Sequence, residues 1–166
     1  MKKIYHIYNC NVELPVRKLQ SLLNDGMSYL DEIGLHDPEP KIESSFDTLE
    51  EAKECFKKYC WTSVSNSMGS GTKYHEVKFF ELWCEIWDDG NEEDEDSDRM
   101  ESIDRTGIEA YELYSENEAS EKYLTKEDAL EDAQSMHFIN ENAEIFLKTY
   151  YNGDEIESSV LTFKEN

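Results

Sequence analysis

The chain has 166 residues, with 39 Asp or Glu against 16 Lys or Arg, so its formal net charge at pH 7 is −23. This charge excludes direct binding to the phosphates of nucleic acid and opposes docking on an anionic membrane surface. The length favours a single domain, 1–166, or one built from two similar halves, and an aromatic content of 12% indicates a folded protein.

The N-terminal segment predicts a strand followed by a helix. Residues 3–8 alternate in the manner of a strand and are rich in Tyr and Ile. Pro15 suits the first turn of a helix, and Gly34 is its predicted end. The apolar face of this helix recurs at three- and four-residue steps, at Val16, Leu19, Leu23, Met27 and Leu30.

Two further helices are predicted after Thr48 and Thr125, within a weak internal repeat. Residues 46–52 and 123–129 share the pattern aromatic-x-Thr-x-Glu-acid-Ala at an offset of 77 residues. Each Thr can cap a helix, and the acid three residues later completes a capping box. The apolar positions are Leu49, Ala52, Phe56 and Tyr59 in the first helix, and Ala129, Ala133, Met136 and His137 in the second. The alternative is a chance match between two ordinary capped helices.

Aromatic-rich strands are predicted after each helix, at about 76–87 and 143–151. A returning strand follows each: at about 108–114 in the first copy, and after the hairpin signal Asn152-Gly153 in the second. Residues 62–73 are predicted to be a loop of small residues. The expected fold is α+β, an antiparallel sheet with about three helices. A helix–strand–strand pseudo-repeat would divide the chain into 1–40, 41–116 and 117–166.

Acidic residues are concentrated in the second half of the sequence. Residues 1–87 have a net charge of −4 and residues 88–166 a net charge of −19. Charge this dense attracts basic partners. The candidate partner-binding residues are Asp88, Asp89, Glu92, Glu93, Asp94, Glu95, Asp96, Asp98, Glu101, Asp104, Glu109 and Glu112. Acids continue through Glu116, Glu118, Glu121, Glu127, Asp128, Glu131 and Asp132.

Three interpretations of the acidic run differ in what they require. A calcium-binding EF-hand starting at Asp94 fails, because Arg99 stands where Gly is needed and Arg105 where Glu is needed. A plain solvated loop requires nothing further. A mimic of nucleic acid requires carboxylates on a folded scaffold, at a density comparable with one charge per about 1.7 Å of duplex. Tyr111, Tyr114, Trp83 and Trp87 are then interface anchors or, in the alternative, core residues.

Motifs for catalysis and for cofactors are lacking. Residues 69–73 resemble a phosphate-binding loop only superficially, since the first Gly of that motif is missing. His6 and Cys10 share one face of a strand, and His75 is distant in sequence. The cysteines Cys10, Cys55, Cys60 and Cys84 form no Cys-x-x-Cys pair and are expected to be free, buried thiols. We therefore expect a protein that is not an enzyme and has no cofactor or metal.

The location expected from the sequence is the cytoplasm of a bacterial host cell. No apolar stretch approaches the ~20 residues of a membrane helix. His6, Asn9 and Asn11 interrupt any apolar region near the N-terminus, so no signal peptide is predicted.

The acids of residues 88–98 and 101–132, on a small chain without catalytic motifs, resemble in class the acidic anti-defence proteins of phages and mobile elements, which include DNA-mimicking anti-restriction and anti-CRISPR proteins. The resemblance implies inhibition by binding to a basic nucleic-acid-binding protein, such as a CRISPR effector nuclease. The first alternative is a protein-interaction module that binds through aromatic strand faces. The second is a small enzyme that uses His6, Cys10 or His75.

Overall fold

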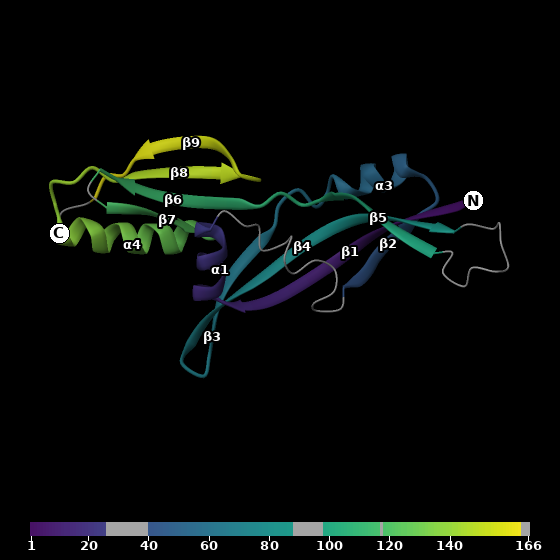
Figure 1. The fold of residues 1–166 in the computed structure, drawn as a ribbon, viewed down its shortest axis with the longest axis horizontal. Helices are drawn as coiled ribbons and strands as arrows, with labels where there is room; N and C mark the ends of the chain where they lie inside the picture. Colours follow the sequence, from purple (N-terminus) through teal and green to yellow (C-terminus); the bar gives the residue numbers. More distant parts are fainter. Residues whose placement is uncertain (26–39, 88–97, 117, 164–166) are drawn as a thin grey trace. The chain divides into compact units, whose positions relative to one another are not determined.

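The computed structural model describes residues 1–25, 40–87, 98–116 and 118–163. These residues form an α+β fold with antiparallel sheets and three helices, which confirms the predicted class (Figure 1). The chain divides into two compact units. Unit 1 contains residues 1–12, 34–63 and 77–106, and unit 2 contains residues 13–33, 64–76 and 107–166. Each unit is therefore assembled from segments that are not consecutive in sequence.

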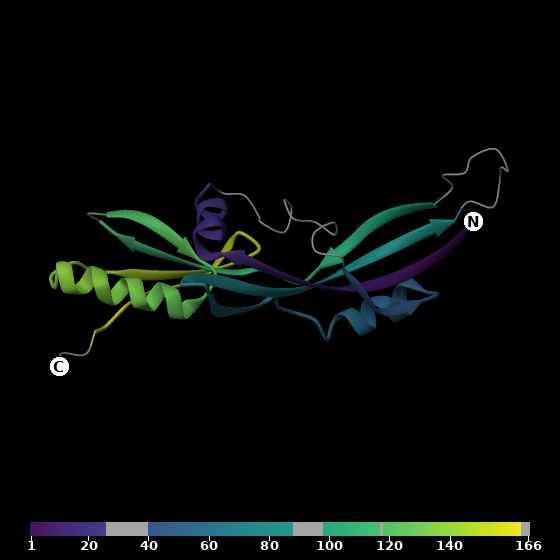
Figure 2. The same cartoon turned by 90° about the horizontal axis from the view of Figure 1, so that it is seen from below.

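Unit 1 is built on β2 (Lys41–Phe46), β5 (Asp98–Arg105) and the larger parts of β1 (Lys2–Pro15) and β4 (Thr72–Trp87), whose residues 13–15 and 72–76 belong to unit 2. β1 pairs with β2, and β5 pairs with β4, both antiparallel. Helix α3 (Leu49–Phe56) lies on one side of these strands (Figure 2). Ala52 and Phe56 of α3 are buried against Ile7 of β1 and Leu82 of β4. The predicted apolar face of this helix is confirmed.

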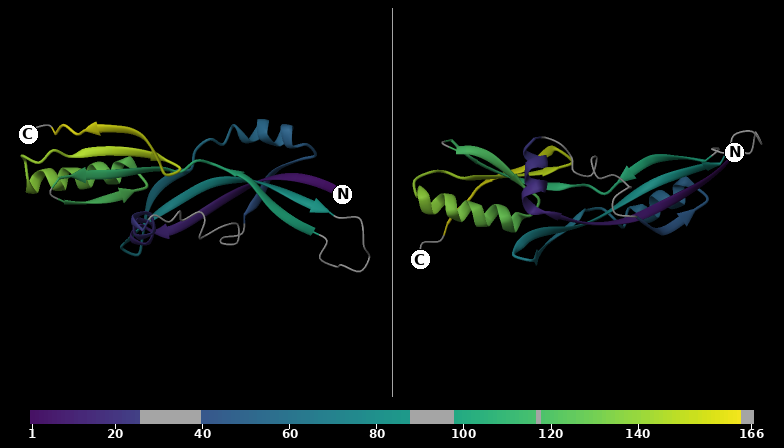
Figure 3. Two further views of the ribbon diagram at one scale, coloured as in Figure 1. Left: turned by 45° about the horizontal axis from the view of Figure 1, so that its top comes forward. Right: turned by 60° about the horizontal axis from the view of Figure 1, so that its bottom comes forward.

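Unit 2 contains a four-stranded sheet of β6 (Glu109–Ser115), β7 (Glu118–Tyr123), β8 (Phe146–Tyr151) and β9 (Asp154–Val160), in the order β7-β6-β8-β9. Helix α4 (Lys126–Ile139) runs along one face of this sheet (Figure 3). Ala129 and Ala133 are buried, and Met136 packs beside them. The turn between β8 and β9 has positive φ at Asn152 (50°) and Gly153 (89°), which confirms the predicted hairpin.

The remaining elements of unit 2 correct one prediction and leave part of another untested. Helix α1 (Val16–Asn24) buries Leu19 and contacts β7, whereas its predicted extension through Met27 and Leu30 lies outside the described residues. Residues 62–73 were expected to form a loop, but they contain β3 (Ser63–Gly69), a tight turn and the start of β4. Positive φ at Ser70 and Gly71 permits that turn, so these small residues make a hairpin instead of an irregular loop.

The two units have related strand orders. In unit 1, β1 is the neighbour of β2 and β4, and β4 also pairs with β5; in unit 2, β6 is the neighbour of β7 and β8, and β8 pairs with β9. In both units the helix begins after a Thr in extended conformation whose side chain accepts a hydrogen bond from the backbone three residues later, at Thr48 and Thr125. One more strand comes before these elements in each unit: β1 precedes residues 41–116, and β6 precedes residues 117–166. The shared arrangement is therefore strand–strand–helix–strand–strand, which has five elements and not three.

Candidate functional site

The predicted partner-binding residues fall into three groups. Residues 88–96 lie outside the described residues. Asp98, Glu101 and Asp104 belong to β5 of unit 1, where Glu101 is exposed and lies 3.5 Å from Arg99. Glu109 and Glu112 belong to β6 of unit 2, and both are half-buried. The predicted residues are therefore divided between two units.

The fold distributes charge more evenly than the sequence does. Unit 1 contains 19 acidic and 9 basic residues, a net of −10, and unit 2 contains 20 acidic and 7 basic residues, a net of −13. The acidic run at residues 88–98 belongs to unit 1 because β4 and β5 pair on either side of it. The contrast between the two sequence halves is thus not a contrast between the two units, and both units are strongly acidic.

Two carboxylates of unit 2 lie within hydrogen-bond distance of one phenol, whose single proton is donated to one of them at a time. The hydroxyl of Tyr123 at the end of β7 lies 3.0 Å from Oε2 of Glu121 and 2.6 Å from Oδ2 of Asp132 on α4. Gln20 of α1 also donates a hydrogen bond to Glu121. Burial, followed by these two carboxylates, raises the pKa of Tyr123, so the phenol stays protonated and keeps its donor. Three elements thereby fix two neighbouring negative charges on the surface.

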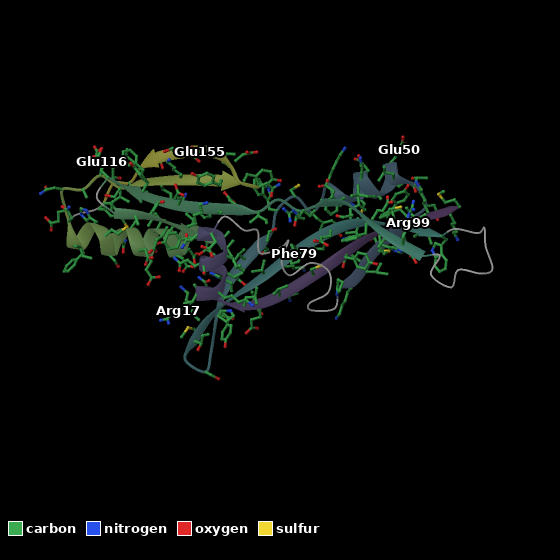
Figure 4. The ribbon with its side chains drawn as sticks, in the orientation of Figure 1. Arg17, Glu50, Phe79, Arg99, Glu116 and Glu155 are labelled. Carbon is green, nitrogen blue, oxygen red and sulfur yellow. The ribbon has the colours of Figure 1, made fainter. Side chains whose placement is uncertain are left out.

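The face of the unit 2 sheet opposite α4 is aromatic. Tyr114 is 43% exposed and its ring contacts that of Phe146 across the strand pair. Lys148 lies over the Tyr114 ring, and the hydroxyl of Tyr150 donates to Glu112. Figure 4 shows the side chains of this unit, with Glu116 and Glu155 labelled; both are exposed acids. Acidic and aromatic groups therefore occur together on this unit.

The four aromatic residues proposed as anchors differ in exposure. Tyr111 packs against the core beneath α4, as the core alternative expects. Tyr114 and Trp87 are 43% and 40% exposed. Trp83 is half-buried, and its indole nitrogen donates to the buried carboxylate of Glu81 over 2.8 Å. Only Tyr114 and Trp87 thus have the exposure that an interface anchor needs.

A second polar cluster in unit 2 surrounds Asp128. Its Oδ1 accepts from Lys73 at 2.5 Å, and its Oδ2 accepts from Thr125 at 2.8 Å and lies 3.8 Å from Nε2 of His75. Burial alone would raise the pKa of Asp128, but the hydrogen bonds from Lys73 and Thr125 outweigh it and the pKa is lowered. These contacts, which span more than fifty positions in sequence, join α4 to the start of β4.

His75 is the least satisfied member of that cluster. The residue is 3% exposed, and its Nδ1 has no hydrogen-bond partner among the described residues. Burial lowers its pKa, so the ring is neutral at pH 7. It lines a cavity of about 10 Å³ with Gln20, Lys122 and Asp128, among others. A cavity of that size has room for about one water molecule, which is too little for an enzyme substrate.

In unit 1, His6 lies between a hydroxyl and a carboxylate. Its Nδ1 is 2.7 Å from Oγ of Ser45, directly opposite on β2, and its Nε2 is 2.6 Å from Oε2 of Glu85 on β4. Because a carboxylate only accepts, His6 donates from Nε2, and in the neutral ring Nδ1 accepts from Ser45. Acid, imidazole and hydroxyl in this order can activate a serine. Polar pairing between neighbouring strands produces the same geometry, as it does for Glu112 and Tyr150 in unit 2.

The cysteines have different environments. Burial, followed by the charge of Glu81, raises the pKa of Cys10 to about 12, so its thiol is protonated and weakly nucleophilic at neutral pH. All four cysteines are free; Cys10 and Cys84 are buried and Cys55 is half-buried. The prediction of buried thiols is wrong for Cys60, which is exposed beyond the end of α3 and donates to the carbonyl of Lys57.

The described residues contain neither a metal-binding cluster nor a membrane-spanning helix. Within residues 1–25, 40–87, 98–116 and 118–163, no group of three or more His, Cys, Asp or Glu side chains is arranged to hold a metal ion. Across the same ranges, no helix has the length and apolar character to cross a membrane.

The comparisons with known proteins are negative. Neither protein-family models, nor curated proteins, nor solved structures give a match to this chain.

Proposed function

We propose that this protein is a non-enzymatic acidic inhibitor that binds a basic nucleic-acid-binding protein by presenting charge as nucleic acid does. The observation that carries the proposal is the pair Glu121 and Asp132, which both lie within hydrogen-bond distance of the hydroxyl of Tyr123 while Gln20 also donates to Glu121. An excess of negative charge alone serves solubility. Carboxylates fixed by hydrogen bonds on neighbouring elements are an array that a cationic cleft can recognise.

The energetics favour a cationic partner. Like charges held side by side repel, and each unit already has a net charge of −10 or −13. Arg or Lys of a partner relieves that repulsion on binding. Since Glu121, Tyr123 and Asp132 are ordered before binding, little conformational entropy is lost when the partner docks. The partner class that we test first is a CRISPR effector nuclease.

The test is competition for DNA. The effector, loaded with guide RNA, binds a fluorescent target duplex, and the inhibitor is titrated in. We expect displacement of the duplex at low salt, with potency falling steeply between about 50 and about 200 mM salt. Failure to displace the duplex at low salt refutes this partner, and potency that is independent of salt refutes charge mimicry.

Paired variants test the array. Glu121→Gln with Asp132→Asn removes two charges at the Tyr123 hydroxyl, whereas Asp154→Asn with Glu157→Gln removes two exposed charges of β9. We expect a larger loss of potency from the first double variant, because binding depends on where the charges are held. Equal losses would show that only net charge matters.

A second candidate is an interaction module that binds through an aromatic sheet face. The face of the unit 2 sheet with Tyr114, Phe146 and Tyr150 favours it. Neutralising residues 92–96 to Asn and Gln separates the two functions. For this variant, charge mimicry predicts a large loss of binding and the aromatic module predicts little change. For Tyr114→Ser, charge mimicry predicts little change and the aromatic module predicts a large loss of binding.

A further inference from the structure

Helix α4 leaves two apolar side chains, Leu130 and Phe138, exposed beside the face that it buries. Its core face contains Ala129, Ala133 and Met136. One residue further along lies a second row at Leu130, Gln134, His137 with Phe138, and Glu141. Leu130 is 37% exposed and Phe138 is 87% exposed, which is unusual for an aromatic side chain of this size. The apolar arc of α4 is therefore wider than the sheet beneath it covers.

The C-terminal segment provides the opposite wall. After β9 the chain passes Leu161, Thr162 and Phe163, and together with the exposed row of α4 these residues line a groove of about 670 Å³. Leu161 is tied to the sheet by a backbone hydrogen bond to Ile145. The ring of Phe163 stacks on His137 with centroids 4.2 Å apart and planes within 6°. Both walls of the groove are thus held by specific contacts.

We propose that this groove, the α4 groove, binds a basic amphipathic helix of a partner protein. From Leu130 to Ile139, where α4 ends, the helix rises roughly 14 Å, the length of about two and a half turns of a bound helix. Apolar side chains at i, i+3 or i+4 and i+7 of such a ligand fit a groove lined by Leu130, Phe138, Leu161 and Phe163.

Charge decides among the occupants of an apolar groove. Glu127 and Glu131 lie on the exposed side of α4, and Glu141 lines the groove itself. A second copy of this chain brings another −23 to the contact, and nucleic acid and anionic lipid surfaces are also repelled. A helix with Lys or Arg flanking its apolar face is attracted to the rim and fills the groove. The partner is therefore basic as well as apolar.

The inference rests on the proposed function only in requiring a basic partner. The groove can be occupied by a partner that handles no nucleic acid, and the Glu121 and Asp132 pair can mimic phosphates while the groove stays empty. The probe is a synthetic 16-residue peptide of Leu and Lys, with Leu confined to one helical face and a fluorophore at one end. A control peptide has the same composition with Leu spread around the helix.

Fluorescence anisotropy measures the affinities. We expect the patterned peptide to bind at least about tenfold more tightly than the control peptide, because only the former buries its Leu side chains. In Leu130→Gln with Phe138→Gln, this advantage should disappear. In Ile156→Gln with Val160→Gln it should persist, since those exposed residues of β9 are not in the groove.

Three outcomes overturn the proposal. The first is equal binding of the two peptides. The second is an advantage that survives in Leu130→Gln with Phe138→Gln, while far-UV circular dichroism shows that this variant is folded. The third is concentration-dependent dimerisation of the protein in sedimentation velocity that Phe138→Gln abolishes, because the groove then binds a second copy. Competition for DNA by Glu121→Gln with Asp132→Asn is measured separately, so failure of the groove and failure of charge mimicry are distinguishable.

Discussion

Asp128→Asn tests the cluster that fastens α4 to β4 within unit 2. The substitution keeps the size of the side chain but removes the negative charge of the carboxylate that accepts hydrogen bonds from Lys73 and Thr125. Asp128 is well protected from water, with a side chain 11% exposed, whereas the Lys73 side chain is 39% exposed. Lys73 therefore regains part of its hydration when its partner is lost, which limits the cost.

The expected loss of unfolding free energy is about 2 kcal/mol. Hydrogen bonds to charged groups contribute about 1.5–3 kcal/mol, and breaking a fully buried ion pair costs about 3–5 kcal/mol. The exposure of Lys73 places this pair in the lower range. A double-mutant cycle with Lys73→Met isolates the pair, and we expect a coupling of about 1–2 kcal/mol.

The pH dependence has a definite sign. Although burial opposes it, hydrogen bonding to Lys73 and Thr125 lowers the pKa of Asp128 in the folded state. The contribution of Asp128 is therefore complete above the unfolded pKa of about 3.9 and is lost as the pH falls through the lower folded value. The stability difference between wild type and Asp128→Asn should be constant near neutral pH and shrink below about pH 4.

The assay can follow the two units separately. All three tryptophans, Trp61, Trp83 and Trp87, belong to unit 1, while α4 is the longest described helix and belongs to unit 2. In urea titrations, far-UV circular dichroism should thus report the loss from unit 2, and tryptophan fluorescence should report unit 1. A change below about 0.5 kcal/mol in the circular dichroism transition, the size of an ordinary surface substitution, would refute the reasoning.

Three further experiments have expected outcomes. Gly107→Ala places a methyl group inside the Tyr151 ring, so we expect a loss of about 1–3 kcal/mol in urea unfolding, partly restored by a second change, Tyr151→Leu. Thr48→Ala should cost about 1 kcal/mol as the loss of a helix cap, and Thr125→Ala should cost more, because Thr125 also donates to the aspartate three residues later; equal losses would contradict this. Cys10, buried and with a raised pKa, should react with a thiol reagent only after unfolding, whereas the exposed Cys60 should react in the native protein; rapid native labelling of Cys10 itself, located by peptide mapping, would contradict its described environment.

Local features of the fold were predictable because neighbouring residues decide them. The Thr48 and Thr125 caps follow from capping chemistry, the buried face of α4 from helical spacing, and the β8–β9 turn from Asn152-Gly153. The same local reasoning failed at residues 62–73, where small residues form a strand and a tight turn. In that hairpin, pairing between strands outweighs the loop composition.

The long-range arrangement was not predictable from one sequence. Nothing in local composition shows that β1 lies between β2 and β4, or that each unit is built from segments that are not consecutive in sequence. The contacts of the candidate sites share this property. His6 meets Glu85 across 79 positions, and Lys73 meets Asp128 across 55. The acids were identifiable by their number, but their hydrogen-bonded partners depend on tertiary structure.

Because the units are interleaved, synthesis imposes an order on folding. β1 leaves the ribosome first, yet unit 1 is complete only when Thr106 has been added, and unit 2 needs segments up to the last residues. At about 5–20 residues per second, the nascent β1 waits roughly 4–14 s for its last partner strand, β4. During that time the apolar side chains of β1 that the fold buries, Ile7, Cys10 and Val12, are not yet covered by that strand.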